Sequence, residues 1–381
     1  MTRGGLSVER MAAGDAAADR ELGAFFEACP TSFAQQTVGW RDVIVSLGVD
    51  EPITLGCRRA GALVGVLPAY RFAGPLGAIL TSCAQAGPLG GVACLPDEDA
   101  EAVYAALLRA FLETARDERC AVASVISNPF WPDAALLERH LEPHFVLENT
   151  CQALDLEGAV DATGGFVGGS NGLRRNLRKA EAAPLVIDEA QTPANVAAWY
   201  EIHAARQREI GTTPLPRALF DAALEHMVPR GKARFFFVRH AGTGELLGGG
   251  FYVVHGAVID AFMPAVRSEE ARLGVGFFLA LHSLRWARRR GLRLYNWQAS
   301  PPASGTARYK QQWGSRDVPY AYLTRVTGDA GALLQSSIAA IRDGYPWHYV
   351  LPFDRLGAGV VPDGCARSSR GSAWVAGEAA R

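Results

Sequence analysis

The chain has 381 residues, 49% of them hydrophobic and 20% charged, with 38 Lys and Arg against 39 Asp and Glu. This is the composition of a globular protein, and the length suits about two domains. A net charge of −1 excludes a strongly basic nucleic-acid-coating protein and an acidic disordered chain, but it is compatible with a local basic groove.

The cysteines and the apolar runs argue against disulfide-rich, zinc-binding, secreted and membrane-spanning proteins. The seven cysteines are odd in number and form no C-x-x-C pair, so free thiols in a reducing compartment fit better than a disulfide framework or a zinc ribbon. The N-terminus lacks a signal-peptide core. The uncharged run 72–96 is long enough to span a membrane, but glycines and prolines interrupt it throughout. We expect buried strand and Gly-rich loop there, no stable membrane insertion and a cytoplasmic location.

The first half of the chain predicts an α/β order. It opens with a polar helix, and residues 52–58 and 62–70 then indicate two strands joined by a tight turn. Residues 97–119 have the apolar spacing of a helix with an acidic first turn, and 121–127 form a short apolar strand.

The second half repeats this order with few identical residues. Three strands are predicted at 233–240, 246–254 and 257–265. A helix at 274–290 and a buried strand at 292–297 follow. The sequence therefore predicts an α/β protein with two similar halves.

The composition between and after the halves sets the expected domain boundaries. Glycines and then a basic helical turn separate the halves, and the last residues are rich in Gly, Ser and Ala. The predicted segments are an N-terminal domain 1–163, a linker 164–185, a C-terminal domain 186–330, an extension 331–356 and a disordered tail 357–381.

Several common catalytic motifs are absent from the sequence. It contains no G-x-x-x-x-G-K-[ST] of P-loop NTPases and no G-x-G-x-x-G after a first strand. H-E-x-x-H and G-x-S-x-G are also absent, which argues against a zinc hydrolase and a serine hydrolase. We predict no metal site.

The connection into the helix at 274–290 is a candidate phosphate site. Gly274 and Gly276 lie at the predicted first turn, where free N–H groups and the helix dipole favour an anion. The alternative is a tight strand-to-helix connection in which glycine allows close packing against the sheet.

An ordered set of segments resembles the FemAB-like branch of the GNAT acyltransferases over about residues 30 to 330. The segments are Gln36 with Trp40, LRRNLRKAEA at 173–182, WYEIHAARQREIG at 199–211, residues 246–264, residues 274–297 and YKQQWG at 309–314. The resemblance implies two fused GNAT-like domains, each a mixed central sheet flanked by helices, around a shared cleft.

The resemblance also implies an activity. The expected reaction is N-acyl transfer, in which an acyl or aminoacyl group passes from acyl-CoA or aminoacyl-tRNA to an amine of a small molecule or the cell envelope. The amine would attack directly, with no covalent enzyme intermediate and no tightly bound cofactor; tRNA is a candidate partner. The alternative is a non-catalytic GNAT-fold binding protein in a polysaccharide or secondary-metabolite system. The oligomeric state is left open.

Tyr309, Lys310 and Trp313 match the family's aromatic-Lys-x-x-aromatic-Gly motif. In the family this lysine is associated with the reacting carbonyl, and a fixed ammonium there stabilises the oxyanion that forms during attack. The resemblance therefore implies catalytic roles for Lys310 and Tyr309 and a substrate-binding role for Trp313. The alternative is a lysine that extends from an amphipathic segment whose aromatic residues pack.

Four residues are candidates for the general base: Asp260, His255, His282 and Tyr295. We favour Asp260. It lies in an apolar strand, where a carboxylate needs a reason to be buried. Alternation places it on one face with Val258 and Phe262, and Ile259 on the other. The alternative is a hydrogen-bonded structural aspartate. His203 is a further candidate, as a residue lining the acceptor pocket.

Basic and glycine residues are candidates for holding the substrates. The basic turn of Arg174, Arg175, Arg178 and Lys179 matches the family's R-x-x-x-[KR]-A segment. Its Arg174 and Arg178 would bind phosphate or carboxylate, unless the turn is a solvated helix face. The carrier would enter where the strands at 257–265 and 292–297 part, with its phosphates on Arg272, Gly274, Val275 and Gly276. The sequence departs from the usual pyrophosphate loop, because Ala271 stands where Gln or Arg is expected.

Overall fold

The computed structural model describes residues 5–85, 87, 89–300 and 303–348. The predicted tail at 357–381 lies outside these residues. Contacts divide the chain into two compact units, one comprising residues up to Asn149 with the segment from Pro319, and the other Thr150–Val318. Both units are α/β, as predicted from the order of strands and helices. Within the described residues, no helix is long and apolar enough to cross a membrane.

The first unit contains a mixed sheet with the strand order β1-β2-β3-β4-β6-β13. Strands β4 and β6 are parallel, the other neighbours on this path are antiparallel, and β5 pairs with β3. Its strands are β1 (Leu6–Met11), β2 (Glu51–Arg59), β3 (Ala62–Gly74), β4 (Gly77–Thr81), β5 (Ala93–Cys94), β6 (Cys120–Ile126) and β13 (Arg316–Val326).

Helices cover both faces of the first sheet. Val64 and Leu67 of β3 share a core cluster with the long helix α3, whereas Leu63 and Val66 pack with α1. The helices are α1 (Ala16–Ala28), η1 (Ala34–Gln36), α2 (Val38–Leu47), α3 (Ala100–Asp117), α4 (Ala134–Leu141), α11 (Gly331–Gln335) and α12 (Ile338–Gly344). The N-terminal strand β1 was not predicted; the polar helix expected there begins only at Ala16.

The second unit has the strand order β7-β12-β11-β10-β9-β8. Only β11 and β12 are parallel among its paired strands. Its strands are β8 (Leu185–Asp188), β9 (Ala233–His240), β10 (Leu246–His255), β11 (Val258–Val266) and β12 (Leu294–Ala299), with β7 (Phe145–Asp155) crossing the division between the units.

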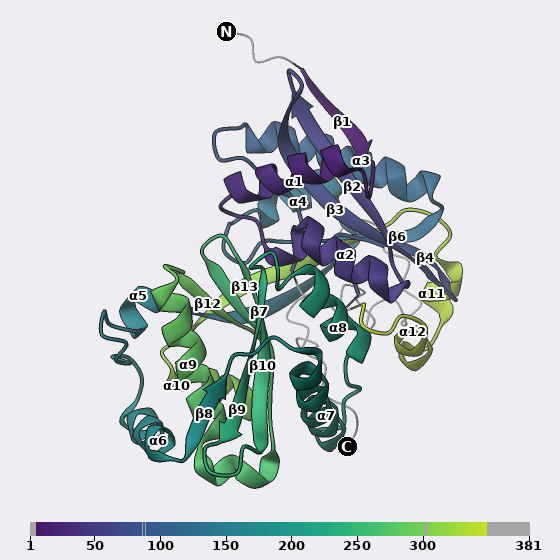
Figure 1. Ribbon diagram of the computed structural model, residues 1–381. Helices are drawn as coiled ribbons and strands as arrows, with labels where there is room; N and C mark the ends of the chain where they lie inside the picture. Colours follow the sequence, from purple (N-terminus) through teal and green to yellow (C-terminus); the bar gives the residue numbers. More distant parts are fainter. Residues whose placement is uncertain (1–4, 86, 88, 301–302, 349–381) are drawn as a thin grey trace. The chain divides into compact units, whose positions relative to one another are not determined.

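Alternating side chains of β9 fix the two faces of the second sheet. Phe236 packs edge-on against Trp286 of α9, and its neighbour Phe235 packs against Trp199 of α7. Figure 1 shows α6 and α9 on one side of these strands and α7 and α8 on the other. The helices are α5 (Leu156–Ala159), α6 (Asn171–Ala182), α7 (Pro193–Glu209), α8 (Arg217–His226), η2 (Ser268–Leu273), α9 (Val275–Arg289) and α10 (Gly305–Gln312).

Candidate functional site

Strands β11 and β12 part in the middle of the second unit. Their parallel pairing begins at Val258 with Leu294 and ends at Asp260 with Asn296, although β11 continues to Val266. A bulge in β11 directly after Asp260 sets two residues against one on β10. Beyond this point the backbone N–H and C=O groups of β11 and β12 no longer pair with each other, as they would in a continuous sheet.

The corresponding strands of the first unit stay together. Strand β4 pairs with β6 to Thr81, the N–H of Ser82 donates to Ser124 O at 2.9 Å, and the Ser82 hydroxyl accepts from the Ile126 N–H at 3.0 Å. The two halves thus share an order of elements but differ at this junction.

Asp260 lies at the point where the strands part. Only 3% of the residue is exposed. Its neighbours Ile259 and Ala261 belong to the core cluster that contains α9, so Asp260 faces the opposite side, as alternation predicts. The Gln298 amide Nε2 of β12 donates to Asp260 Oδ1. The carboxylate is therefore buried in a polar environment.

Lys310 reaches the same place from α10. Ser304 caps this helix through the N–H of Ala307, and Lys310 in its last turn is 7% exposed. Its Nζ donates to Gln298 O at 2.9 Å and Ala299 O at 3.1 Å. Burial lowers the pKa of the Lys310 ammonium to about 7, and this exceeds the opposite effect of Cys151 and Asp260.

Lysine is rare in this chain, which makes Lys310 more informative. The chain has only three lysines, at 179, 232 and 310, and the rest of its 38 Lys and Arg residues are arginines. Arginine stays protonated at every physiological pH, whereas a buried lysine can lose its proton.

Buried polar groups surround the pair. Cys151 of β7 lies opposite Ala299, and the next residue, Gln152, donates to Ala307 O at 3.3 Å. The buried polar atoms that have no hydrogen-bond partner among the described residues include Gln152 Oε1, Asn296 Nδ2 and Ser300 Oγ. Because buried polar groups are normally paired, they offer hydrogen bonds to a bound substrate or to water.

The aromatic residues of the lysine motif pack around it. Tyr309 is half-buried against Phe277 of α9, at 5.4 Å between ring centroids, and its hydroxyl donates to Gly276 O at 3.4 Å. Burial raises the pKa of the Tyr309 phenol, so it acts as a neutral donor. Trp313 has no exposed surface and lies 5.6 Å from Trp297. Trp313 therefore packs in the core beside α10, and the substrate-binding role that the resemblance implies for it stays a prediction.

The first turn of α9 is glycine-rich for two different reasons. Gly274 caps the helix with φ of +73°, and a Cβ there would lie 3.0 Å from that of Ala180 in α6. Gly274 thus allows α9 and α6 to pack closely, which fits the interpretation of this glycine as a packing residue rather than a phosphate-binding one. A Cβ added at Gly276 would meet no atom of the described residues within 4 Å, so its backbone is approachable, and the buried Val275 lies between the two glycines. The Arg272 side chain is 80% exposed.

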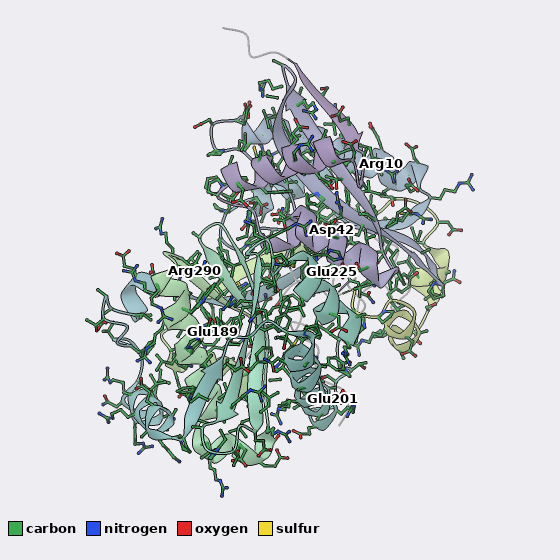
Figure 2. All side chains as sticks on the ribbon, in the orientation of Figure 1. Arg10, Asp42, Glu189, Glu201, Glu225 and Arg290 are labelled. Atoms are coloured by element: carbon green, nitrogen blue, oxygen red, sulfur yellow. The ribbon has the colours of Figure 1, made fainter. Side chains whose placement is uncertain are left out.

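The basic residues of α6 lie on its outer face. Leu173 and Leu177 face the core, whereas Arg174 and Arg178 are exposed. The Ala180–Gly274 approach places this helix beside the start of α9. Arg290, which is labelled in Figure 2, follows the other end of α9. Its guanidinium carbon lies 5.0 Å from the centroid of the Trp286 ring.

His203 lies in the core on the α7 side of the sheet. It is fully buried, stacks on Trp199 at 5.6 Å and meets the Phe220 ring at 5.3 Å. Neither ring nitrogen has a hydrogen-bond partner among the described residues. Burial lowers the pKa of the imidazole to about 4, so it is neutral. Such a residue has no surface to offer an acceptor unless α7 moves.

This burial predicts acid sensitivity. The unfolded chain takes up a proton on His203 near pH 6.5, whereas the folded protein does so only near 4. The stabilising contribution is present above pH 6.5 and is lost as pH falls toward 4, by about 3 kcal/mol. His203→Leu should therefore flatten the pH dependence of the unfolding free energy between pH 6.5 and 4, as measured by urea denaturation. An unchanged dependence would contradict this assignment.

The structure brings together some of the predicted site residues. Asp260, Lys310 and the half-buried Tyr309 lie around the junction of β11, β12 and α10. Sequence reasoning missed Gln298, which contacts both Asp260 and Lys310. No motif marks a glutamine in a strand, and its left-handed backbone, with φ of +64°, leaves no sign in the sequence.

Comparisons with known proteins bear on the fold that holds these residues. Residues 169–311 match a family model described as an acetyltransferase (GNAT) domain, a range that includes Asp260, Gln298 and Lys310. No curated protein matches the sequence significantly. The solved structures that resemble the fold at low sequence identity include FemX and two others. FemX has a TM-score of 0.65 at 13% identity, covering 83% of this chain and 97% of FemX.

The other two neighbours also extend over most of the chain. A tandem GNAT protein from the clavulanic acid biosynthesis pathway has a TM-score of 0.52 at 17% identity, over 85% of this chain and 99% of that one. The C-terminal domain of a putative lysylphosphatidylglycerol synthetase from Agrobacterium fabrum has a TM-score of 0.55 at 14% identity, over 83% and 94%. At these identities the likeness is one of fold.

Proposed function

From the premise that this chain has the tandem GNAT fold of the FemAB-like group, with a GNAT domain at residues 169–311, we propose that it is an N-acyltransferase. It would move an acyl or aminoacyl group from acyl-CoA or aminoacyl-tRNA to an amine and form an amide. The observation that carries this proposal is the meeting of Asp260 and Lys310 at Gln298, where β11 and β12 part.

The two groups suit the two requirements of the reaction. An amine must lose a proton when it attacks, and the Asp260 carboxylate is the base that would take it. Negative charge develops on the carbonyl oxygen, and the Lys310 ammonium would stabilise it. The new C–N bond forms and the bond between the acyl carbon and the carrier breaks. The thiol or hydroxyl of the carrier leaves with the proton that Asp260 took from the amine. Positioning of both substrates supplies much of the remaining acceleration.

The carrier would approach along the first turn of α9. Both carriers bear phosphates. Positive charge is available there from Arg272 and from the exposed Arg174 and Arg178 of α6, and backbone N–H groups are available at Val275 and Gly276. The acceptor would be an amine of a small molecule or of the cell envelope. The junction contains polar atoms that can bind either substrate.

Direct binding distinguishes the carriers. We would titrate the purified protein calorimetrically with CoA and acetyl-CoA at moderate salt, and test tRNA in a pull-down followed by aminoacyl transfer. Micromolar CoA binding would identify the acyl-CoA enzyme. Salt-sensitive tRNA binding with transfer would identify the other. Binding of neither carrier would refute the proposed function and favour a non-catalytic binding protein.

The basic residues on the outer face of α6 should contribute to binding of the carrier. Replacing Arg174 and Arg178 together with alanine removes two charges from the surface without touching the buried Leu173 and Leu177. The dissociation constant of the carrier should rise about tenfold, and the salt dependence of binding should weaken. Arg109→Ala, an exposed arginine of the first unit, is the matched control. Equal affinities for both variants would assign α6 to a solvated face.

A further inference from the structure

Gln298 occupies an unusual place in β12. Between Asn296, opposite Ala153, and Ala299, opposite Cys151, strand β12 has one residue more than β7. Gln298 lies in this bulge with φ of +64°, a conformation that glycine adopts easily and other residues do not. Strained residues of this kind cluster at functional sites, because the surrounding structure must hold them in place.

Three polar groups of Gln298 make hydrogen bonds within the site. Its N–H donates to Asn296 Oδ1 at 3.0 Å. Its side-chain amide donates to Asp260 Oδ1, and its carbonyl accepts from Lys310 Nζ at 2.9 Å. One residue therefore contacts, through different atoms, the two groups to which we give the chemistry.

We propose that Gln298 is a positioning residue that fixes the Asp260 carboxylate relative to the Lys310 ammonium. The bulge turns the Gln298 carbonyl toward α10 and its side chain toward β11, so both groups are held at one end of the opened strands. This inference rests on the proposed acyl transfer. It adds a residue that touches the base and the ammonium without itself exchanging a proton.

The contacts separate this role from a purely structural one. A residue that served only the fold would be most stable as glycine at this φ, since glycine removes the strain and keeps the carbonyl that Lys310 uses. A residue that serves the reaction needs the side-chain amide, although the amide adds nothing that the backbone requires. Gln298→Gly therefore removes the positioning function and retains the bulge.

Steady-state kinetics with the donor and amine found in the transfer assay test the proposal. We expect Gln298→Gly to lower kcat at least tenfold, with KM within threefold of wild type, because the carboxylate is misplaced while substrate binding surfaces remain. Its melting temperature should stay within about 3 °C of wild type. Ala60→Gly, at a hairpin turn of the first unit with φ of +50°, is the matched backbone control and should leave kcat unchanged.

A second variant keeps the test independent of glycine flexibility. Gln298→Glu has nearly the same shape but cannot donate to Asp260 when ionised, so its kcat should fall as far as that of Gln298→Gly. Unchanged kcat in both folded variants would overturn the inference while leaving the proposed function intact. A wild-type protein that transfers no acyl group from either carrier would instead refute the proposed function, and this inference with it.

Discussion

Lys310→Met should lower kcat about 100- to 1,000-fold, the usual cost of removing a group that stabilises an oxyanion. Methionine fills a similar volume, so the packing of α10 against Trp313 and Phe277 should survive. Burying the ammonium costs desolvation free energy, and the substitution removes this cost. The gain offsets the loss of the two hydrogen bonds from Lys310 Nζ to Gln298 O and Ala299 O. We therefore expect a large loss of rate with a small change in stability, measured by steady-state kinetics and thermal melting.

The matched control is Lys232→Met. Lys232 Nζ contacts His255 Nδ1 at 3.0 Å and is not among the groups that meet at Gln298. Loss of this lysine should leave kcat within a factor of two. Equal effects of the two substitutions would contradict a special role for Lys310.

The ionisation of Lys310 should also make kcat depend on pH. Because its pKa is lowered to about 7, the ammonium form should disappear as pH rises above that value, and kcat should fall with it. The chain has three lysines, so 13C labelling of lysine gives few resonances, and the exposed Lys179 provides an internal reference. A Lys310 resonance that titrates above pH 9 would contradict the assignment.

Much of the fold could be predicted because its signals are local. The spacing of apolar residues at 97–119 predicted α3, and the described residues of the uncharged run at 72–96 are strand and loop around β4. Strand β13 was beyond such reasoning, because it pairs with β6 about two hundred positions earlier, as the Ser124 and Thr324 hydroxyls at 2.7 Å illustrate. Periodicity shows that a segment is extended, but not which distant strand it joins.

Two residues of the candidate site could be predicted from the sequence, but the way they come together could not. Asp260 was predicted because a carboxylate is out of place in an apolar strand, and Lys310 because of the resemblance carried by its motif. That the two meet depends on where the pairing of β11 and β12 stops and on a bulge one residue long. Neither feature has a sequence signal, since the bulged residue is a glutamine rather than a glycine.

Asp260→Asn should lower kcat about 100- to 10,000-fold if this carboxylate takes the proton of the attacking amine. The asparagine oxygen can still accept the hydrogen bond from the Gln298 amide, so the local structure should be retained. The loss of rate should then be in kcat rather than KM, because the group acts on a proton that leaves only during attack.

The same substitution should also be visible without turnover. The Asp260 charge raises the pKa of Lys310 against the larger effect of burial. Asp260→Asn removes that charge, so the Lys310 resonance should titrate below the wild-type value of about 7. A lowered rate with an unmoved Lys310 titration would mean that Asp260 and Lys310 do not interact, and would contradict the shared site. A moved titration with an unchanged rate would keep the site and remove Asp260 as its base.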